Sequence, residues 1–345
     1  MQFTSPACHE NAASPASFRH RCDPHSAING NEIGIRIFQA HITCVIAPRW
    51  LSACVGDRKY FTFKALFAGR CSLGSQTTSD HRRHSDRQMP DQGQQSPTNG
   101  IVFIHGVGGS ARAWQPQVES FRAAGYTPLA LDLPGYGGRP AIESIDFEQF
   151  SDDVEAQIAR AGLIRPVLVG HSLGGMIAQT MLRRKPQGYR AVILVGTSPS
   201  FGRPDGDFQK KFVADRLAPL EAGKTMPELA AGMINEIIGP NADPKGKEVA
   251  IASMAAAPAS TYKACVEAIV TFEERANLGH ISVPTMCLVG EFDNNAPAAI
   301  MQRMAAKIPG AKFVMLPGLG HLPNLENPAA FDEAVLGFLR DVAFE

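Results

Sequence analysis

The stretch Gly170-His171-Ser172-Leu173-Gly174-Gly175 lies between a short apolar run, Val167-Leu168-Val169, and a helical pattern that begins at Met176. A serine between glycines at a strand-to-helix turn keeps its hydroxyl exposed, because only small neighbours fit so sharp a turn. The backbone N–H of Leu173 then faces the place where a carbonyl oxygen would gain negative charge, and the helix dipole favours that charge. The pattern predicts a nucleophilic Ser172, with Leu173 as one oxyanion-hole donor. An ordinary glycine-rich turn is the structural alternative.

A serine hydroxyl needs a base to take its proton, and the base needs a group that orients it. Asp293 follows the apolar run Thr285–Val289, and His321 follows the run Lys312–Leu316. Both residues therefore lie at the carboxyl ends of expected strands, where α/β sheets place their chemistry. The chain order serine, acid, histidine is the one that accompanies this kind of turn. We predict that Asp293 and His321 complete a triad with Ser172; a helix cap and a solvated loop histidine are the alternative interpretations.

The second oxyanion donor is expected in the loop after the apolar run Ile101–Ile104, and Val107 is the best candidate there. His105 in the same loop is expected to brace it through hydrogen bonds. His171, beside the serine, is expected to pack or to form a pocket wall. Glu291 is a rival acid to Asp293, although it lies nearer its strand.

These residues resemble the α/β-hydrolase superfamily over about residues 98–345. The matching pieces are the loop, elbow and strand-end motifs His105-Gly106 with Gly109-Ser110 and Trp114, Asp132-Leu133-Pro134-Gly135-Tyr136-Gly137, Gly170–Gly175, Gly290-Glu291-Phe292-Asp293 and Gly320-His321. The resemblance implies a mostly parallel sheet flanked by helices, with catalysis at its carboxyl edge.

Within the superfamily, the C-terminal half is most similar to 3-oxoadipate enol-lactonases and related small esterases. Tyr262-Lys263-Ala264-Cys265 and His321-Leu322-Pro323-Asn324-Leu325-Glu326 carry this second resemblance. His171 counts modestly against C–C bond hydrolases, which often have Asn there. Ser172 argues against epoxide hydrolases and haloalkane dehalogenases, which use Asp as the nucleophile.

Strands and helical patterns alternate from residue 98 onward, which is typical of a parallel sheet covered on both faces. The expected strands are Ile101–Ile104, Pro128–Leu131, Pro166–Val169, Ala191–Val195, Thr285–Val289 and Lys312–Leu316. The expected helices between and after them are Ala111–Ala123, Phe147–Ala161, Met176–Arg184, Ala298–Lys307 and Ala329–Val342.

The alternation stops after Ala191–Val195, and residues 198–277 form four successive helical patterns: Phe208–Glu221, Met226–Ile238, Lys245–Met254 and Ser260–Glu273. A helical insertion on the catalytic side predicts a cap over Ser172 that excludes water and shapes the pocket. Its methionines Met226, Met233 and Met254 suit an apolar wall or simple core packing. Its basic residues Lys210, Lys211, Arg216 and Lys263 are candidates to meet a substrate carboxylate, or are solvated.

Residues 1–97 differ from the rest and hold Cys8, Cys22, Cys44, Cys54 and Cys71, five of the seven cysteines. We expect a poorly ordered or atypical extension. Translation from a wrong start, with Met89 as the restart, and a small element in Ile33–Ile46 and Tyr60–Phe67 are the other interpretations. Neither a secretory signal nor a transit peptide is predicted. The hairpin that usually precedes the first parallel strand of such hydrolases is not found before Gly100.

The 345 residues carry no formal net charge, and 44% of them are hydrophobic. This composition predicts a globular protein without nucleic-acid or membrane partners. The cysteines form no C-x-x-C pair and no metal-ligand spacing appears, so no metal is expected, and the cytoplasm is the expected compartment. The serine chemistry needs no cofactor, and none is expected. The oligomeric state is left open.

The motifs together predict a serine hydrolase that acts on a small-molecule ester or lactone through an acyl-enzyme. A C–C bond hydrolase or a hydrolase-like ligand receptor with the same triad is the alternative. A remoter one is an NAD(P)-binding oxidoreductase, because Gly106-Val107-Gly108-Gly109-Ser110-Ala111 and Asp132 fit a dinucleotide-binding pattern. That interpretation leaves Ser172, Asp293 and His321 as coincidences.

Overall fold

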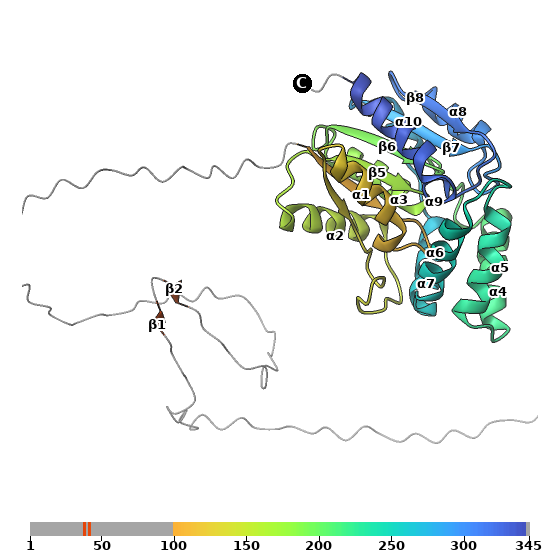
Figure 1. Cartoon of the computed structure of the whole chain (residues 1–345). Helices are drawn as coiled ribbons and strands as arrows, with labels where there is room; N and C mark the ends of the chain where they lie inside the picture. The colour runs from red at the N-terminus through yellow and green to blue at the C-terminus, as the bar shows by residue number, and fades with distance from the viewer. Residues whose placement is uncertain (1–36, 39–40, 43–98, 343–345) are drawn as a thin grey trace, which may run out of the picture. The chain divides into compact units, whose positions relative to one another are not determined.

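The computed structural model describes residues 37–38, 41–42 and 99–342, and the chain divides into two units, residues 1–86 and 87–345 (Figure 1). In the first unit, β1 (Ile37–Phe38) pairs antiparallel with β2 (His41–Ile42). Both short strands fall inside the predicted element Ile33–Ile46. The remaining predictions for residues 1–97 lie outside the described residues.

The second unit is built on a six-stranded parallel sheet with the strand order β4-β3-β5-β6-β7-β8. The strands are β3 (Gly100–Ile104), β4 (Thr127–Ala130), β5 (Val167–His171), β6 (Ala191–Val195), β7 (Thr285–Gly290) and β8 (Lys312–Leu316). The four central strands are buried throughout, because helices cover both faces of the sheet. The predicted α/β fold with a mostly parallel sheet is confirmed.

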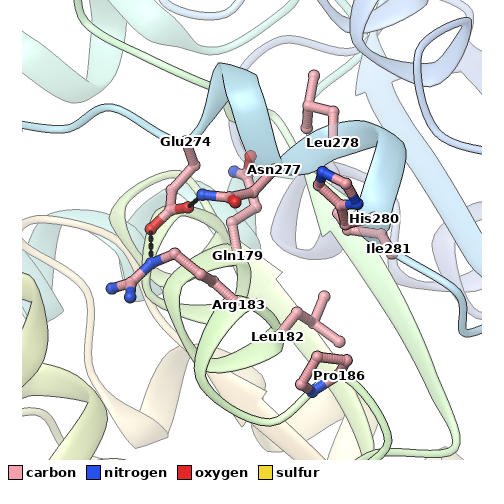
Figure 2. A pocket seen from close by; sticks show the side chains of 9 residues that line it. All are labelled: Gln179, Leu182, Arg183, Pro186, Glu274, Asn277, Leu278, His280 and Ile281. Atoms are coloured by element: carbon pink, nitrogen blue, oxygen red, sulfur yellow. Dashed lines mark hydrogen bonds and ion pairs between the residues drawn. The ribbon is translucent and has the colours of Figure 1, made fainter.

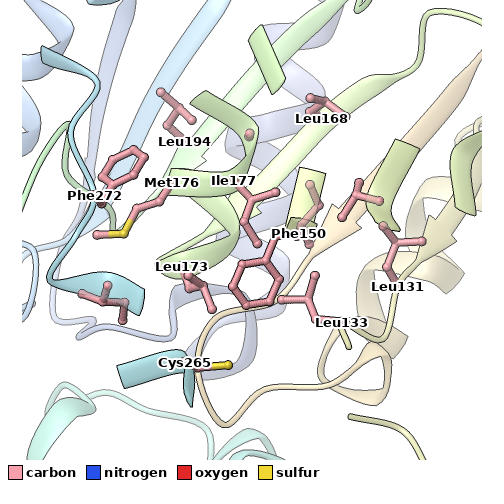
Figure 3. Close-up of a cluster of buried hydrophobic side chains, with 14 of the residues drawn as sticks. Leu131, Leu133, Phe150, Leu168, Leu173, Met176, Ile177, Leu194, Cys265 and Phe272 are labelled. Atoms are coloured by element: carbon pink, nitrogen blue, oxygen red, sulfur yellow. The ribbon is translucent and has the colours of Figure 1, made fainter. Parts of the chain in front are cut away.

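Alternate strand residues face two separate apolar layers. On one face, η1 (Ala111–Trp114), α1 (Gln115–Ala123) and α10 (Pro328–Asp341) bury Trp114, Phe121 and Phe331 against Phe103. On the other face, α2 (Phe147–Arg160), α3 (Leu173–Arg184) and α8 (Ala298–Ala305) share the larger core. Figure 3 shows part of that core, in which Leu173 and Ile177 of α3 meet Phe150 of α2.

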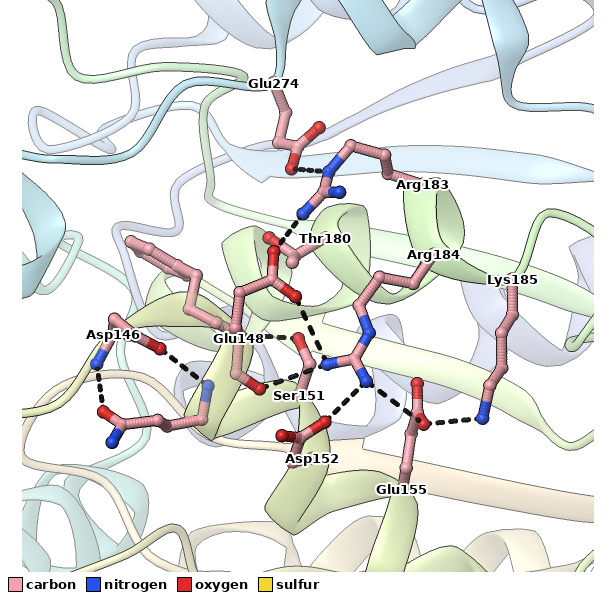
Figure 4. A network of polar contacts seen from close by, with 12 residues as sticks. Asp146, Glu148, Ser151, Asp152, Glu155, Thr180, Arg183, Arg184, Lys185 and Glu274 are labelled. Atoms are coloured by element: carbon pink, nitrogen blue, oxygen red, sulfur yellow. Dashed lines mark hydrogen bonds and ion pairs between the residues drawn. The ribbon is translucent and has the colours of Figure 1, made fainter.

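Helix α3, which begins directly after Ser172, is tied to α2 by a chain of charged groups (Figure 4). Arg184 contacts Asp152 at 2.5 Å, and Lys185 contacts Glu155 at 2.6 Å. Arg183 binds the buried Glu274 at 2.8 Å, and it also pairs with Glu148. Because exposed ion pairs are individually weak, the pairs that lie at the surface orient α3 rather than supply much stability.

Between β6 and β7 the structure places four helices, α4 (Asp207–Glu221), α5 (Met226–Ile237), α6 (Pro244–Ala255) and α7 (Ala259–Ile269), which are grouped together in Figure 1. They are followed by η2 (Arg275–His280). The last helix ends four residues earlier than its pattern predicts. Phe272 and Glu274 instead exchange backbone hydrogen bonds with residues 199–201, which draws the chain back to the sheet.

Candidate active site

Ser172 occupies the turn between β5 and α3 in a strained backbone conformation, with φ 52° and ψ −115°. Such a conformation costs about 1–3 kcal/mol and persists only where the surroundings fix it. Here the Ser172 N–H donates to the Val195 carbonyl at 2.9 Å, and the Thr197 hydroxyl donates to the Ser172 carbonyl at 2.8 Å. The turn holds the serine partly exposed at the carboxyl edge of the sheet. Sequence reasoning missed Thr197, since a threonine after a strand carries no special signal.

Both glycines of the predicted elbow are required by packing. A Cβ at Gly170 would overlap the Gly174 carbonyl, and a Cβ at Gly174 would overlap the Ile104 carbonyl. Backbone atoms cannot move away as a flexible side chain can. The G-x-S-x-G spacing therefore allows α3 to start directly against β3 and β5, which brings the loop after β3 beside Ser172. The predicted strand ends at Val169, whereas β5 continues through His171.

His321 and Asp293 form a buried pair, with His321 Nδ1 2.8 Å from Asp293 Oδ2. Asp293 is 2% exposed and His321 is 7% exposed. Burial alone would raise the pKa of Asp293, but the charge and hydrogen bond of His321 and the Ala296 N–H outweigh it, so the pKa is lowered. An ionised Asp293 accepts a hydrogen bond from the Nδ1–H of His321, so that Nε2 carries the free lone pair.

The loop that carries His321 is fixed by the buried carboxylate of Glu326. Its Oε2 accepts from the N–H groups of Gly320 at 2.6 Å and Gly239 at 2.8 Å, and its Oε1 accepts from the Leu322 N–H at 2.8 Å. Two of these donors flank His321 directly. Sequence reasoning did not single out Glu326, because its partners come from separate parts of the chain.

His171 and His105 brace the surroundings of Ser172. The Nε2–H of His171 donates to the His321 carbonyl at 2.7 Å, and the Leu133 N–H donates to Nε2 of His105 at 3.1 Å. Burial lowers the pKa of His171 to about 3 and that of His105 to about 4, so both rings are neutral at pH 7. These contacts agree with the structural roles expected for the two histidines.

Two residues from rival interpretations have structural partners. Oδ1 of Asp132 accepts from the Ala111 N–H at 2.8 Å, at the start of η1 where a dinucleotide pyrophosphate would need free N–H groups. Glu291 is exposed and accepts from the Gly318 N–H at 2.9 Å. The geometry therefore favours neither a ribose-binding Asp132 nor Glu291 as the partner of His321.

Two backbone donors border the serine. Val107 lines a cavity together with Ser172 and His321, and Leu173 is the first residue of α3. Within the described part of the chain, neither residue's N–H donates a hydrogen bond. Both N–H groups are therefore available to an oxygen placed beside Ser172.

A cavity of about 480 Å³ opens on Ser172 and His321. Its walls are largely apolar and come from α4, α5 and α7 as well as from the loops after β3, β6 and β7. A narrower space of about 60 Å³ on the Trp114 side shares Val107, Ser172 and His321. The volume of the larger cavity suits a small organic ligand.

Hydrogen bonds therefore connect only some of the predicted site residues. Asp293 and His321 share a hydrogen bond, and Ser172 faces the same cavity as His321. Within residues 99–342, the structure records no hydrogen bond between Ser172 and His321. Met233 lines the cavity, whereas Met226 and Met254 belong to the buried core, and Met254 also borders the narrower space.

A second cavity, of about 290 Å³, lies behind α3 between Leu182, Pro186, Leu278 and Ile281 (Figure 2). Its polar lining residues are Gln179, Arg183, Glu274, Asn277 and His280, of which Arg183 and Glu274 bind each other. This cavity contains none of the predicted catalytic residues.

In the described ranges, no group of His, Cys, Asp and Glu side chains is arranged to hold a metal ion. Cys265 and Cys287 are buried free thiols, and burial raises their pKa values to about 11 and about 12. None of the helices described here has the length and apolar character needed to cross a bilayer.

A sequence model of the Alpha/beta hydrolase family matches residues 101–334. Among curated proteins, the 2-succinyl-6-hydroxy-2,4-cyclohexadiene-1-carboxylate synthase of Pectobacterium atrosepticum is 28% identical over 243 residues, covering 69% of this chain and 93% of that protein.

Solved structures give the same fold. A thermophilic esterase from Thermogutta terrifontis superposes with a TM-score of 0.62 at 27% identity, over 70% of this chain and 89% of that one. An enol-lactonase from Burkholderia xenovorans superposes with a TM-score of 0.64 at 23% identity, over 72% and 94% of the two chains, and supports the fold alone.

Proposed function

Because this chain belongs to the alpha/beta hydrolase family, we propose that it is a serine hydrolase that cleaves a small ester or lactone. One observation carries the proposal: His321, which is hydrogen-bonded to the buried Asp293, lines the same cavity as the strained, partly exposed Ser172. The esterase among its structural relatives supports the same reaction class.

In the proposed reaction, Ser172 Oγ attacks the substrate carbonyl carbon while Nε2 of His321 takes the hydroxyl proton. Asp293 holds the ring in the Nδ1–H tautomer and stabilises the imidazolium that forms. The N–H groups of Val107 and Leu173 bind the oxyanion. His321 returns the proton to the leaving alkoxide, and then activates the water that hydrolyses the acyl-enzyme.

The helices between β6 and β7 act in this proposal as a cap. Phe212 of α4, Met233 of α5 and Tyr262 of α7 line the cavity above Ser172. An apolar cover lowers the local dielectric constant, which strengthens the interaction of the oxyanion with its donors. The cap thus sets the size of substrate that reaches the serine.

The test is turnover of a panel of 4-nitrophenyl esters, simple lactones and enol-lactones by the wild type and by Ser172→Ala. We expect kcat to fall by about 10⁴–10⁶ without loss of folding, measured by circular dichroism. Ser282→Ala, which changes an exposed serine outside the cavity, is the matched control and is expected to retain activity. Near-normal turnover by Ser172→Ala would refute the proposal; ligand binding without turnover would favour the receptor alternative.

A further inference from the structure

We propose that the substrate of this site carries a carboxylate, and that Arg216 binds it with Arg303 as a second cation. The inference rests on the proposed hydrolase function and narrows its substrate class. Both arginines line the cavity that opens on Ser172. No Asp or Glu side chain is among the described residues that line it.

Arg216 is held in place on the cavity wall without the use of a carboxylate. Its guanidinium carbon lies 4.7 Å from the centre of the Phe212 ring, and one Nη donates to Asn295 Oδ1 at 3.0 Å. Phe212 and Asn295 also line the cavity. A guanidinium has five N–H donors, so most of them remain available to a ligand, and the stacked ring fixes their direction. This arrangement is preorganised for a planar anion.

Arg303 lines the same cavity from α8, the helix that follows the loop containing Asn295 in the chain. Its side chain belongs to an exposed residue, and in the described part of the chain it forms no ion pair. Two cations in a wall that contains no described Asp or Glu side chain give the cavity a positive potential, which attracts an anionic substrate. Sequence reasoning did not identify Arg303, because its helix lies far from the insertion.

The lysines of the helical insertion, unlike Arg216, do not line the cavity. Lys211 contacts Asp215 at 2.7 Å, and Lys263 lies 3.9 Å from Glu267. Neither lysine, nor Lys210, is among the lining residues of the cavity. Asp215 is next to Arg216 in sequence but pairs with Lys211, so it does not neutralise the arginine. Of the four cations considered from the sequence, the structure therefore selects Arg216.

The experiment compares 4-nitrophenyl hydrogen adipate with 4-nitrophenyl hexanoate, which has the same acyl length but no charge. At low salt we expect kcat/KM to be at least about tenfold higher for the anionic ester, and the ratio to fall toward one in 0.5 M NaCl. Arg216→Met is expected to lower the ratio about tenfold, and Arg303→Met several-fold. The ratio cancels changes that affect both esters equally. Lys211→Met, which removes a charge from the same helix outside the cavity, is expected to leave the ratio unchanged.

The carboxylate site and the hydrolase activity can be refuted separately. Equal kcat/KM values for the two esters, or a ratio that Arg216→Met does not change, would overturn the inference while leaving the hydrolase intact. If neither ester is cleaved, adipate binding is measured by calorimetry instead. Binding that Arg216→Met weakens and Lys211→Met does not would support the carboxylate site without the hydrolase. The absence of adipate binding would overturn the carboxylate site, while the wider panel of esters and lactones decides the hydrolase.

Discussion

Replacement of Glu326 by glutamine tests how strongly the loop around His321 depends on one buried carboxylate. Glu326 is 2% exposed, and its two oxygens accept three backbone N–H groups, from Gly239, Gly320 and Leu322. A glutamine has nearly the same shape but only one oxygen. If that oxygen faces Gly239 and Gly320, its NH₂ group faces the Leu322 N–H, and two donors oppose each other.

The cost follows from these contacts. A buried donor without an acceptor costs about 1–3 kcal/mol, and hydrogen bonds to a charged group contribute more than those to a neutral amide. Together the lost bond and the two weakened bonds amount to about 3 kcal/mol. For a domain of this size, 1 kcal/mol corresponds to about 2–4 °C, so we expect Tm to fall by about 6–12 °C. The His321 loop should loosen first, so kcat/KM should fall as well.

Urea and thermal unfolding followed by circular dichroism measure this loss. Glu333→Gln is the control, since Glu333 is exposed on α10 and its replacement should move Tm by no more than about 1 °C. If Glu326→Gln unfolds at the same temperature as the wild type, the Glu326 carboxylate does not hold the loop as described.

Two further changes test the elbow and the buried histidines. Gly174→Ala should destabilise the fold by about 3 kcal/mol in urea unfolding, because the new Cβ would overlap the Ile104 carbonyl. Gly232→Ala, in open space on α5, should instead stabilise the fold by about 0.5–1 kcal/mol. Similar effects of the two substitutions would contradict the packing argument. Since burial lowers the pKa values of His105 and His171 in the fold, only the unfolded chain takes up their protons as the pH falls below the ordinary histidine pKa of about 6.5. The free energy of unfolding should therefore fall from about pH 6.5 toward pH 4 by about 1.4 kcal/mol per pH unit for each ring. His171→Gln should remove about half of that slope. A free energy of unfolding that stays constant between pH 7 and 5 would show that the two rings do not have lowered pKa values.

The order of the elements could be predicted from sequence because each buried strand is a distinct apolar run. The expected strands Ala191–Val195 and Lys312–Leu316 agree with the structure. The predicted C-terminal end of β5, at Val169, was wrong by two residues, because Gly170 and His171 continue the strand into the elbow. Local propensity does not contain that information, since the extension depends on pairing with β6.

The candidate site also has a part that the sequence predicts and a part that only the fold reveals. The motif around Ser172 and the strand-end positions of Asp293 and His321 are visible in the chain itself. The supporting residues are not, because Glu326 and Thr197 act through partners that only the fold brings close, and Arg303 reaches the cavity only in the fold. Arg216 was one of four equivalent cations until the structure placed it on the cavity wall.

Reaction of the protein with a fluorophosphonate, followed by peptide mass spectrometry, tests the central claim most directly. The reagent forms a P–O bond to an activated hydroxyl and releases fluoride. The account predicts one adduct, on Ser172, formed in step with the loss of esterase activity and strongly slowed in His321→Ala. An adduct on another residue that abolishes activity, or full activity after Ser172 has been modified, would contradict it.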